Sequence, residues 1–147
     1  MCGTQSLKKR SFTDYGWESN LISDSDLGVA LNTILNLNKN KDFIFTDQDD
    51  FKKRFSDLAF TDGALPNLDT ERAVIGKTSE PNNYLRLFYR IRDAFAHGKY
   101  CLVFHSATNE KMVVMEDNDR YNFTARMVLK LRTIIGFIDT VDKNCRI

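Results

Sequence analysis

Residues 82–98 read NNYLRLFYRIRDAFAHG, and this stretch decides the fold that the sequence predicts. Its apolar side chains recur every three or four residues, which is typical of a helix with one buried face. The residues expected on that face are Tyr84, Leu87, Phe88, Ile91, Ala94 and Phe95. Pro81 favours a helix start, and Gly98 favours an end because glycine readily adopts the positive φ of a helix cap. We therefore expect a helix over residues 80–97.

The sequence on either side of this helix predicts three more helices and one hairpin. Residue types that cap helices precede runs of apolar residues at helical spacing, and the most regular run is the last one. The expected helices cover residues 25–38, 47–60 and 122–143. Two short runs of β-prone residues, separated by a polar turn, predict a β-hairpin over residues 100–116. Gly63 and Pro66 break the pattern, so residues 62–78 are expected to form a loop.

The predicted architecture is mainly α, a compact bundle of four principal helices with a short β-hairpin before the last one. A chain of 147 residues is long enough for one domain with a buried core. We expect that domain to span residues 1–147. Residues 1–20 are polar and aperiodic apart from three aromatic side chains, which favours a loose N-terminal arm.

Composition excludes several classes of function. Lys and Arg number 21 and Asp and Glu number 20, so the net charge of +1 provides no broad basic surface for duplex nucleic acid. The three cysteines are scattered and only two histidines are present, which argues against a metal site. No apolar run approaches the length of a membrane span. We expect a cytoplasmic protein without a cofactor.

The polar side chains of the 80–97 helix lie in two stripes. Arg86, Arg90, Asp93 and His97 share one face at spacings of four, three and four residues. Arg92 lies on a different face, flanked by apolar residues. A guanidinium in that position needs an anion, a partner chain or open water, because burying an unpaired charge is costly.

The segment Arg92–His97, RDAFAH, resembles the signature of HEPN-domain ribonucleases, in which an arginine precedes a histidine by a short spacer and is often followed by a polar residue. The wider stretch from Leu85 to Tyr100 and the later segment 122–130 also resemble small stand-alone HEPN proteins of bacteria and plasmids. The resemblance implies a compact helical domain and a metal-independent endoribonuclease, acting as a toxin or a phage-defence effector. Its partners would be RNA and an antitoxin or other regulatory protein.

The resemblance also implies a homodimer with a composite site, in which Arg92 of one protomer meets His97 of the other. The expected interface is the helix face made of Leu85, Tyr89, Arg92 and Ala96. Arg90 and His97 fit the longer form of the same signature, and seven residues apart they lie within about 20° on one helix face. The residues therefore leave open which arginine belongs to the motif, and we favour Arg92.

Metal-free RNA cleavage needs a base, an acid and a cation near the phosphate. His97 suits proton transfer near neutral pH, and Arg92 suits the phosphate because its donors never deprotonate. Asp93 is expected to orient His97 or to hold an arginine. The residues expected to contact RNA or phosphate are Arg90, Lys99 and Tyr100.

Two other functions compete with this interpretation. The first is a non-catalytic HEPN module that binds nucleotide, RNA or a protein partner in a regulatory role, which the near-neutral net charge favours. The second is a helical dimeric scaffold without a ligand. For His97 itself, the alternative role is an interaction with the carbonyl groups at the helix end.

Overall fold

The computed structural model describes residues 26–37, 39–47, 50–51, 53–54, 70–76, 82–105, 107–118 and 123–145. Their elements, in chain order, are α1 (Asp26–Ile34), β1 (Phe43–Thr46), β2 (Arg72–Gly76), α3 (Asn83–Ala96), β3 (Tyr100–Phe104), β4 (Lys111–Asn118), β5 (Phe123–Lys130) and α4 (Leu131–Cys145). The fold is therefore α/β, and the prediction of a mainly α bundle of four helices is wrong.

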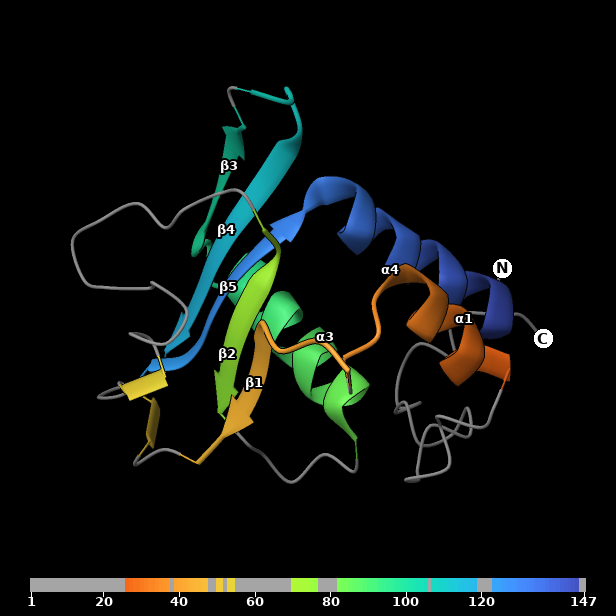
Figure 1. The fold of residues 1–147 in the computed structure, drawn as a ribbon, viewed down its shortest axis with the longest axis horizontal. Coiled ribbons are helices and arrows are strands. Elements are labelled where there is room, and N and C mark those ends of the chain that lie inside the picture. The colour runs from red at the N-terminus through yellow and green to blue at the C-terminus, as the bar shows by residue number, and fades with distance from the viewer. Residues whose placement is uncertain are drawn as a thin grey trace.

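The strands form one mixed sheet in the order β1-β2-β5-β4-β3 (Figure 1). β1 and β2 are parallel, and every later neighbour is antiparallel. Helices α1, α3 and α4 share a hydrophobic core with one face of this sheet. β3 is an outer strand, and α3 leads directly into it, so the end of α3 lies beside one edge of the sheet.

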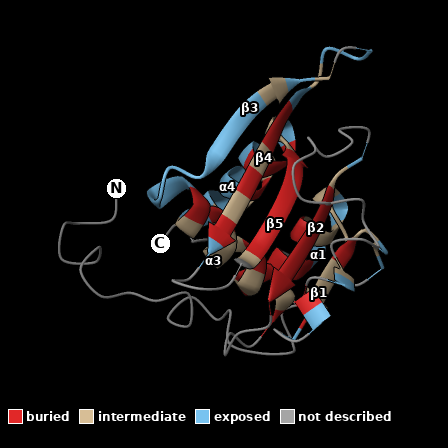
Figure 2. Ribbon diagram, turned by 90° about the vertical axis from the view of Figure 1, so that its left-hand side faces the viewer, coloured by how far each residue is buried: buried red, intermediate tan, exposed pale blue. Residues whose placement is uncertain are grey.

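The main core lies between the three helices and the sheet. Alternate strand residues point into it, among them Ile75, Val113, Met115, Met127 and Leu129. The opposite face carries a smaller buried cluster of Phe51, Val74, Met112 and Val128. Figure 2 shows the result, with the central strands buried and β3 largely exposed.

Two of the predicted helices are confirmed in position, with shorter bounds. α1 falls within residues 25–38, and α3 falls within residues 80–97. The first turn of α3 is capped by Asn82, whose side-chain oxygen accepts a hydrogen bond from the Leu85 amide at 3.0 Å. The predicted hairpin over residues 100–116 is also confirmed, as β3 and β4.

The predicted helix over residues 122–143 is wrong in its first part, which forms β5. In β5, Ala125, Met127 and Leu129 face the helices while Val128 faces the other cluster, so both faces are buried. A strand that is buried on both faces has apolar residues at consecutive positions. Such a run lacks a period of two, so periodicity does not distinguish the strand from a helix. The chain passes from β5 into α4 without an intervening glycine or proline, so the sequence offers no boundary.

Strands β1 and β2 were also not predicted, and β2 lies inside the expected loop 62–78. Both are short, and all five residues of β2 are buried. The predicted helix 47–60 lies largely outside the described residues, although residues 51, 53 and 54 are helical. The predicted N-terminal arm, residues 1–20, lies outside them entirely.

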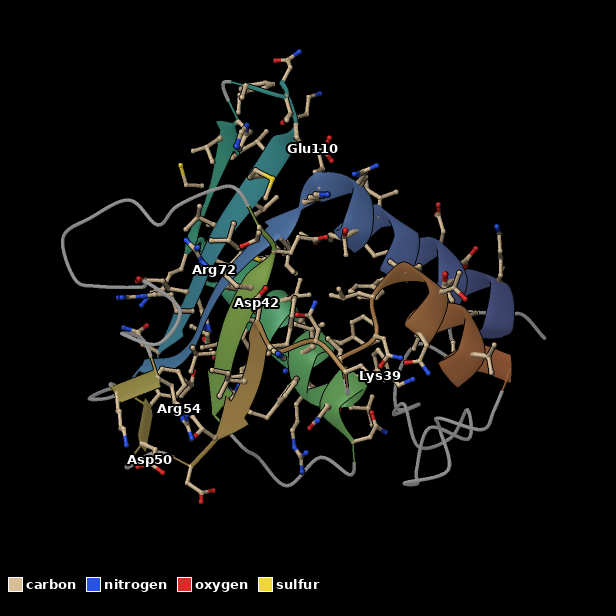
Figure 3. All side chains as sticks on the ribbon, in the orientation of Figure 1. Lys39, Asp42, Asp50, Arg54, Arg72 and Glu110 are labelled. Atoms are coloured by element: carbon tan, nitrogen blue, oxygen red, sulfur yellow. The ribbon has the colours of Figure 1, made fainter. Side chains whose placement is uncertain are left out.

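The pairing of β4 with β5 joins the hairpin to the rest of the sheet, and an ion pair also links it to α4. The Oε1 of Glu110, the residue directly before β4 (Figure 3), lies 2.6 Å from the Nε of Arg132 in the first turn of α4. Asn109 has a positive φ of 56° in the hairpin turn, a conformation that asparagine tolerates well. Within the described part of the chain, no helix is long and apolar enough to cross a membrane.

Candidate functional site

The candidate site begins at the C-terminus of α3, where the backbone follows a Schellman motif. The Lys99 amide donates to the Ala94 carbonyl at 2.8 Å, and the Gly98 amide donates to the Phe95 carbonyl at 3.1 Å. Gly98 has a φ of +67°, as expected for a helix-ending glycine. His97 is the C-cap residue, so its side chain is held at the last turn of the helix.

The same turn attaches the hairpin to the helix end. The Lys99 carbonyl accepts a hydrogen bond from the Glu116 amide at 3.0 Å, directly before β3 pairs with β4. This bond fixes the end of β4 next to the end of α3. Asp117, one residue further along β4, is thereby placed against the polar stripe of α3.

Asp117 is a buried carboxylate with three polar neighbours. Its Oδ2 accepts hydrogen bonds from Arg90 Nη1 at 3.1 Å and from Thr124 Oγ1 at 2.7 Å. Its Oδ1 lies 3.5 Å from His97 Nδ1. One residue of α3, the C-cap residue of that helix and one residue of β5 therefore meet on a single carboxylate of β4. Arg90 supplies the opposite charge that a buried carboxylate requires.

His97 combines this buried neighbour with access to solvent. Its side chain is 56% exposed, whereas that of Asp117 is 5% exposed. A carboxylate beside Nδ1 favours the tautomer with the proton on Nδ1, which leaves Nε2 free to accept a proton. The site therefore combines an accessible imidazole with a buried carboxylate next to its Nδ1.

A second carboxylate, Asp93, lies between the two arginines of the motif. Its Oδ1 accepts hydrogen bonds from Arg92 Nη2 at 2.9 Å and from Arg92 Nε at 3.1 Å. Its Oδ2 lies 3.9 Å from Arg90 Nη1. Arg92, Asp93, Arg90 and Asp117 thus form a continuous line of alternating charge that ends at the imidazole of His97, and we call these five residues the charged row.

Arg92 is the exposed end of the charged row. Its side chain is 63% exposed, and its guanidinium carbon lies 4.6 Å from the centre of the Tyr89 ring. This geometry is a cation–π contact that leaves hydrogen-bond donors accessible to a ligand.

The other two predicted contact residues follow the helix. Lys99 is exposed and donates from Nζ to Asn118 Oδ1. Tyr100 is half exposed and packs on Phe95, with ring centres 4.6 Å apart. The structure thus places all six predicted site residues on α3 or just beyond it.

The structure separates the roles of the two arginines. Arg90 shares Asp117 with His97, whereas Arg92 contacts Asp93 and Tyr89 and lines an apolar groove between α3 and α4. Within one chain, Arg90 and His97 are therefore the motif pair that a shared carboxylate links.

The expected dimer face of α3 needs a correction. Leu85 is only 2% exposed and belongs to the core of its own chain, although the sequence placed it on a spare face. Helix α3 packs against both the sheet and α4, so it buries a wider arc than a simple bundle would require. Of the predicted interface, Arg92 and Ala96 are exposed and Tyr89 is partly buried.

Known proteins provide no identification. No family model, curated protein or solved structure matches the chain. The HEPN resemblance of the Arg92–His97 segment therefore stays a prediction, and function rests on the geometry of the site. Among the described residues, no group of three or more His, Cys, Asp or Glu side chains is arranged to hold a metal ion.

The sequence did not predict Asp117 and Thr124 as site residues, and both come from strands. One available signal was the alternation of Val113 and Met115, both core residues, which continues to Asp117 on the same face of β4. A carboxylate at a core position requires a cation, and the α3 arginines are the cations that the fold brings to it.

Proposed function

We propose that this protein is a metal-independent endoribonuclease, with His97 as the proton-transfer residue and Asp117 as the residue that orients it. One observation carries the proposal: an accessible imidazole whose Nδ1 faces a buried carboxylate at 3.5 Å. Arg90 completes the arrangement by binding that carboxylate from the other side. The proposal retains the chemistry that the HEPN resemblance implies, without the helical bundle.

The reaction is an attack within the RNA strand. Nε2 of His97 accepts the proton of a ribose 2′-hydroxyl, and the resulting oxygen attacks the adjacent phosphorus. A bond forms between the 2′-oxygen and phosphorus, and the bond to the 5′-oxygen breaks. The leaving 5′-oxygen takes a proton from solvent. The products are a 2′,3′-cyclic phosphate and a 5′-hydroxyl.

Exposed cations next to His97 support binding of the phosphate. Arg92 and Lys99 are exposed on either side of it along the chain, and each is held by a single polar neighbour. Bound phosphate would compete with Asp93 for the Arg92 guanidinium, which binds phosphate in a bidentate manner. Tyr100 provides an exposed ring on which a base can stack.

The proposal extends to where the protein acts and what restrains it. A ribonuclease of this kind would act in the cytoplasm as a toxin or a phage-defence effector. Such an enzyme would require an antitoxin or another regulatory protein to restrain it. The small net charge of +1 suits contact with a few phosphates rather than with a long duplex.

The test is cleavage of a labelled single-stranded RNA by purified protein in excess EDTA. We expect cleavage to persist with the chelator, and to disappear when every ribose carries a 2′-O-methyl group. His97→Ala should remove the activity. The matched control is His105→Ala, because His105 is the other histidine of the chain and its Nδ1 accepts from the Thr108 amide in the hairpin turn. His105→Ala should retain the wild-type rate.

A second candidate is supported by the apolar groove between α3 and α4. The groove encloses about 500 Å³ and is lined by Phe88, Phe95, Phe137 and Ile138, with Arg92 and Asp142 also in its lining. An apolar groove with a few polar groups is typical of a ligand site. If wild type and His97→Ala cleave RNA equally, or if cleavage requires magnesium, the nuclease proposal fails and a regulatory binding module replaces it.

A further inference from the structure

Strand β3 is the exposed edge of the sheet. It is the last strand in the order, and among the described residues it pairs with β4 alone. Tyr100, Leu102 and Phe104 are 50%, 49% and 56% exposed on it. Figure 2 shows this strand as a largely exposed band beside the buried centre of the sheet. An exposed apolar edge readily pairs with another chain.

The backbone of β3 determines which groups are available at this edge. The Lys99 carbonyl accepts from the Glu116 amide, and the His105 amide donates to the Glu110 carbonyl. In an antiparallel pair, residues alternate between bonding to the neighbour and pointing away from it. Odd-numbered residues of β3 therefore bond to β4. The amide and carbonyl groups of Tyr100, Leu102 and Phe104 point outward.

We propose that this edge pairs, in antiparallel orientation, with β3 of a second copy of the chain, about a two-fold axis at Leu102. In this register Leu102 opposes Leu102 of the second copy, and Tyr100 opposes Phe104. All three are outward-pointing residues, so each opposed pair exchanges both of its backbone hydrogen bonds. The two sheets join into one continuous sheet across the axis.

The side chains favour a second copy as the occupant. Tyr100 pairs with Met115 and Leu102 with Val113 inside each chain, so these side chains lie on the helix side of the sheet. In the proposed register the residues directly opposite Tyr100 and Leu102 are Phe104 and Leu102 of the second copy, so apolar side chains face apolar side chains. The contact is self-complementary and closed by the two-fold axis, as a symmetric dimer requires.

Association in solution tests the interface directly. Sedimentation velocity should give wild type twice the 17.0 kDa chain mass, and Leu102→Lys should give the mass of a single chain. Lysine at this position places two like charges opposite each other on the axis. The matched control is Ile138→Lys, because Ile138 is 62% exposed but lies on α4, where it lines the α3–α4 groove, and not on β3. This variant should remain dimeric.

Disulfide cross-linking tests the register. In the proposed pairing Cys101 opposes Val103 of the second copy as a non-hydrogen-bonded pair, with Cα atoms about 4.5 Å apart, which is within disulfide range. In a background with Cys2→Ser and Cys145→Ser, Val103→Cys should form a covalent dimer on mild oxidation. Phe104→Cys is the control, since its introduced thiol lies on the other face of the strand from Cys101.

Sedimentation and cross-linking measure association of the chain and not RNA cleavage. A negative result in either one therefore overturns the proposed β3 dimer and leaves the proposed ribonuclease function unaffected. A wild-type monomer at about 100 µM would overturn the inference, since only very weak association escapes detection there. So would a dimer that Leu102→Lys leaves intact, or one that Ile138→Lys dissociates, which would place the interface on the α3–α4 groove. Equal cross-linking by Val103→Cys and Phe104→Cys would contradict the register.

Discussion

Asp117 connects the stability of the fold to its proposed chemistry. The same carboxylate accepts hydrogen bonds from Arg90 and Thr124 and faces the ring of His97. A carboxylate in this position limits the orientations of the imidazole that are favourable. A change at Asp117 therefore acts on His97 even though Asp117 is too buried to contact RNA.

The two arginines of the charged row should differ in their effect on stability. Arg90→Ala leaves Asp117 buried without its cation, so we expect a loss of about 2 kcal/mol or more in the free energy of unfolding. Arg92→Ala removes an exposed ion pair, so we expect a change within about 0.5 kcal/mol. Urea unfolding measures both. Equal losses would contradict the partner assignments.

The sequence predicted every residue of the charged row except Asp117, the carboxylate that links Arg90 to His97. Arg90, Arg92, Asp93 and His97 lie within eight consecutive positions of one helix, so helical spacing alone relates them. Asp117 lies on a strand twenty positions beyond His97, and its place depends on the pairing of β3 with β4. Spacing along one helix carries no information about that pairing.

At the level of elements, the cap of α3 sets the position of the hairpin. Gly98→Ala should lower the free energy of unfolding by about 1 kcal/mol, because an L-residue is strained at positive φ. A Cβ at Gly98 would contact no other atom within 4 Å, so the cost is conformational rather than steric. Gly98→Asn is the matched control and should lose less, because asparagine tolerates this conformation. Thermal unfolding compares the two, and an equal loss would count against a conformational cause.

Helix α3 is also tied to α1, through Tyr84. The Tyr84 hydroxyl donates to the Asn32 side-chain oxygen and lies 3.2 Å from the Leu35 carbonyl. Burial raises the pKa of Tyr84 above the usual value of 10.0, and a backbone hydrogen bond with Leu37 acts in the opposite direction. The neutral phenol is therefore favoured in the folded state more than in the unfolded state.

This shift predicts a specific loss of stability in alkali. The contribution of Tyr84 is fully present below pH 10.0 and is lost as the pH rises toward its folded-state pKa. Tyr84→Phe should cost about 1 kcal/mol at neutral pH, through the lost hydrogen bonds. Its stability should then fall less steeply than that of wild type above pH 10.0. Parallel curves for the two proteins, from urea unfolding across this range, would contradict the assignment.

Elements with one buried face were predictable, and elements buried on both faces were not. The periodicity of α3 and α1 identified both helices, and turn residues identified the hairpin. β2 and β5 alternate between two buried environments, so each contains an unbroken apolar run, residues 73–75 and 127–129, without a period of two. The apolar run of β5 continues into the helical pattern of α4. The sequence therefore gives no sign that the strand ends and the helix begins at Leu131.

At the scale of the whole molecule, the central sheet accounts for the difference between prediction and structure. Three helices cover one face of it and a second cluster covers the other, so the sheet is the middle layer of the fold. This arrangement brings the ends of α3 and β4 together, which a bundle of helices would not require. The candidate site is a consequence of that sheet.

The central claim is that His97, oriented by Asp117, transfers the proton in RNA cleavage. The most direct measurement is the rate of RNA cleavage by His97→Ala with and without added imidazole. We expect this variant to be about 10²–10⁴-fold slower than wild type, since that is the usual contribution of a general base. Because the side chain is 56% exposed, free imidazole can enter its place and should restore part of the rate. Adding Asp117→Asn should weaken that rescue. Cleavage by His97→Ala at the wild-type rate, or a lost activity that imidazole does not restore, would contradict the claim.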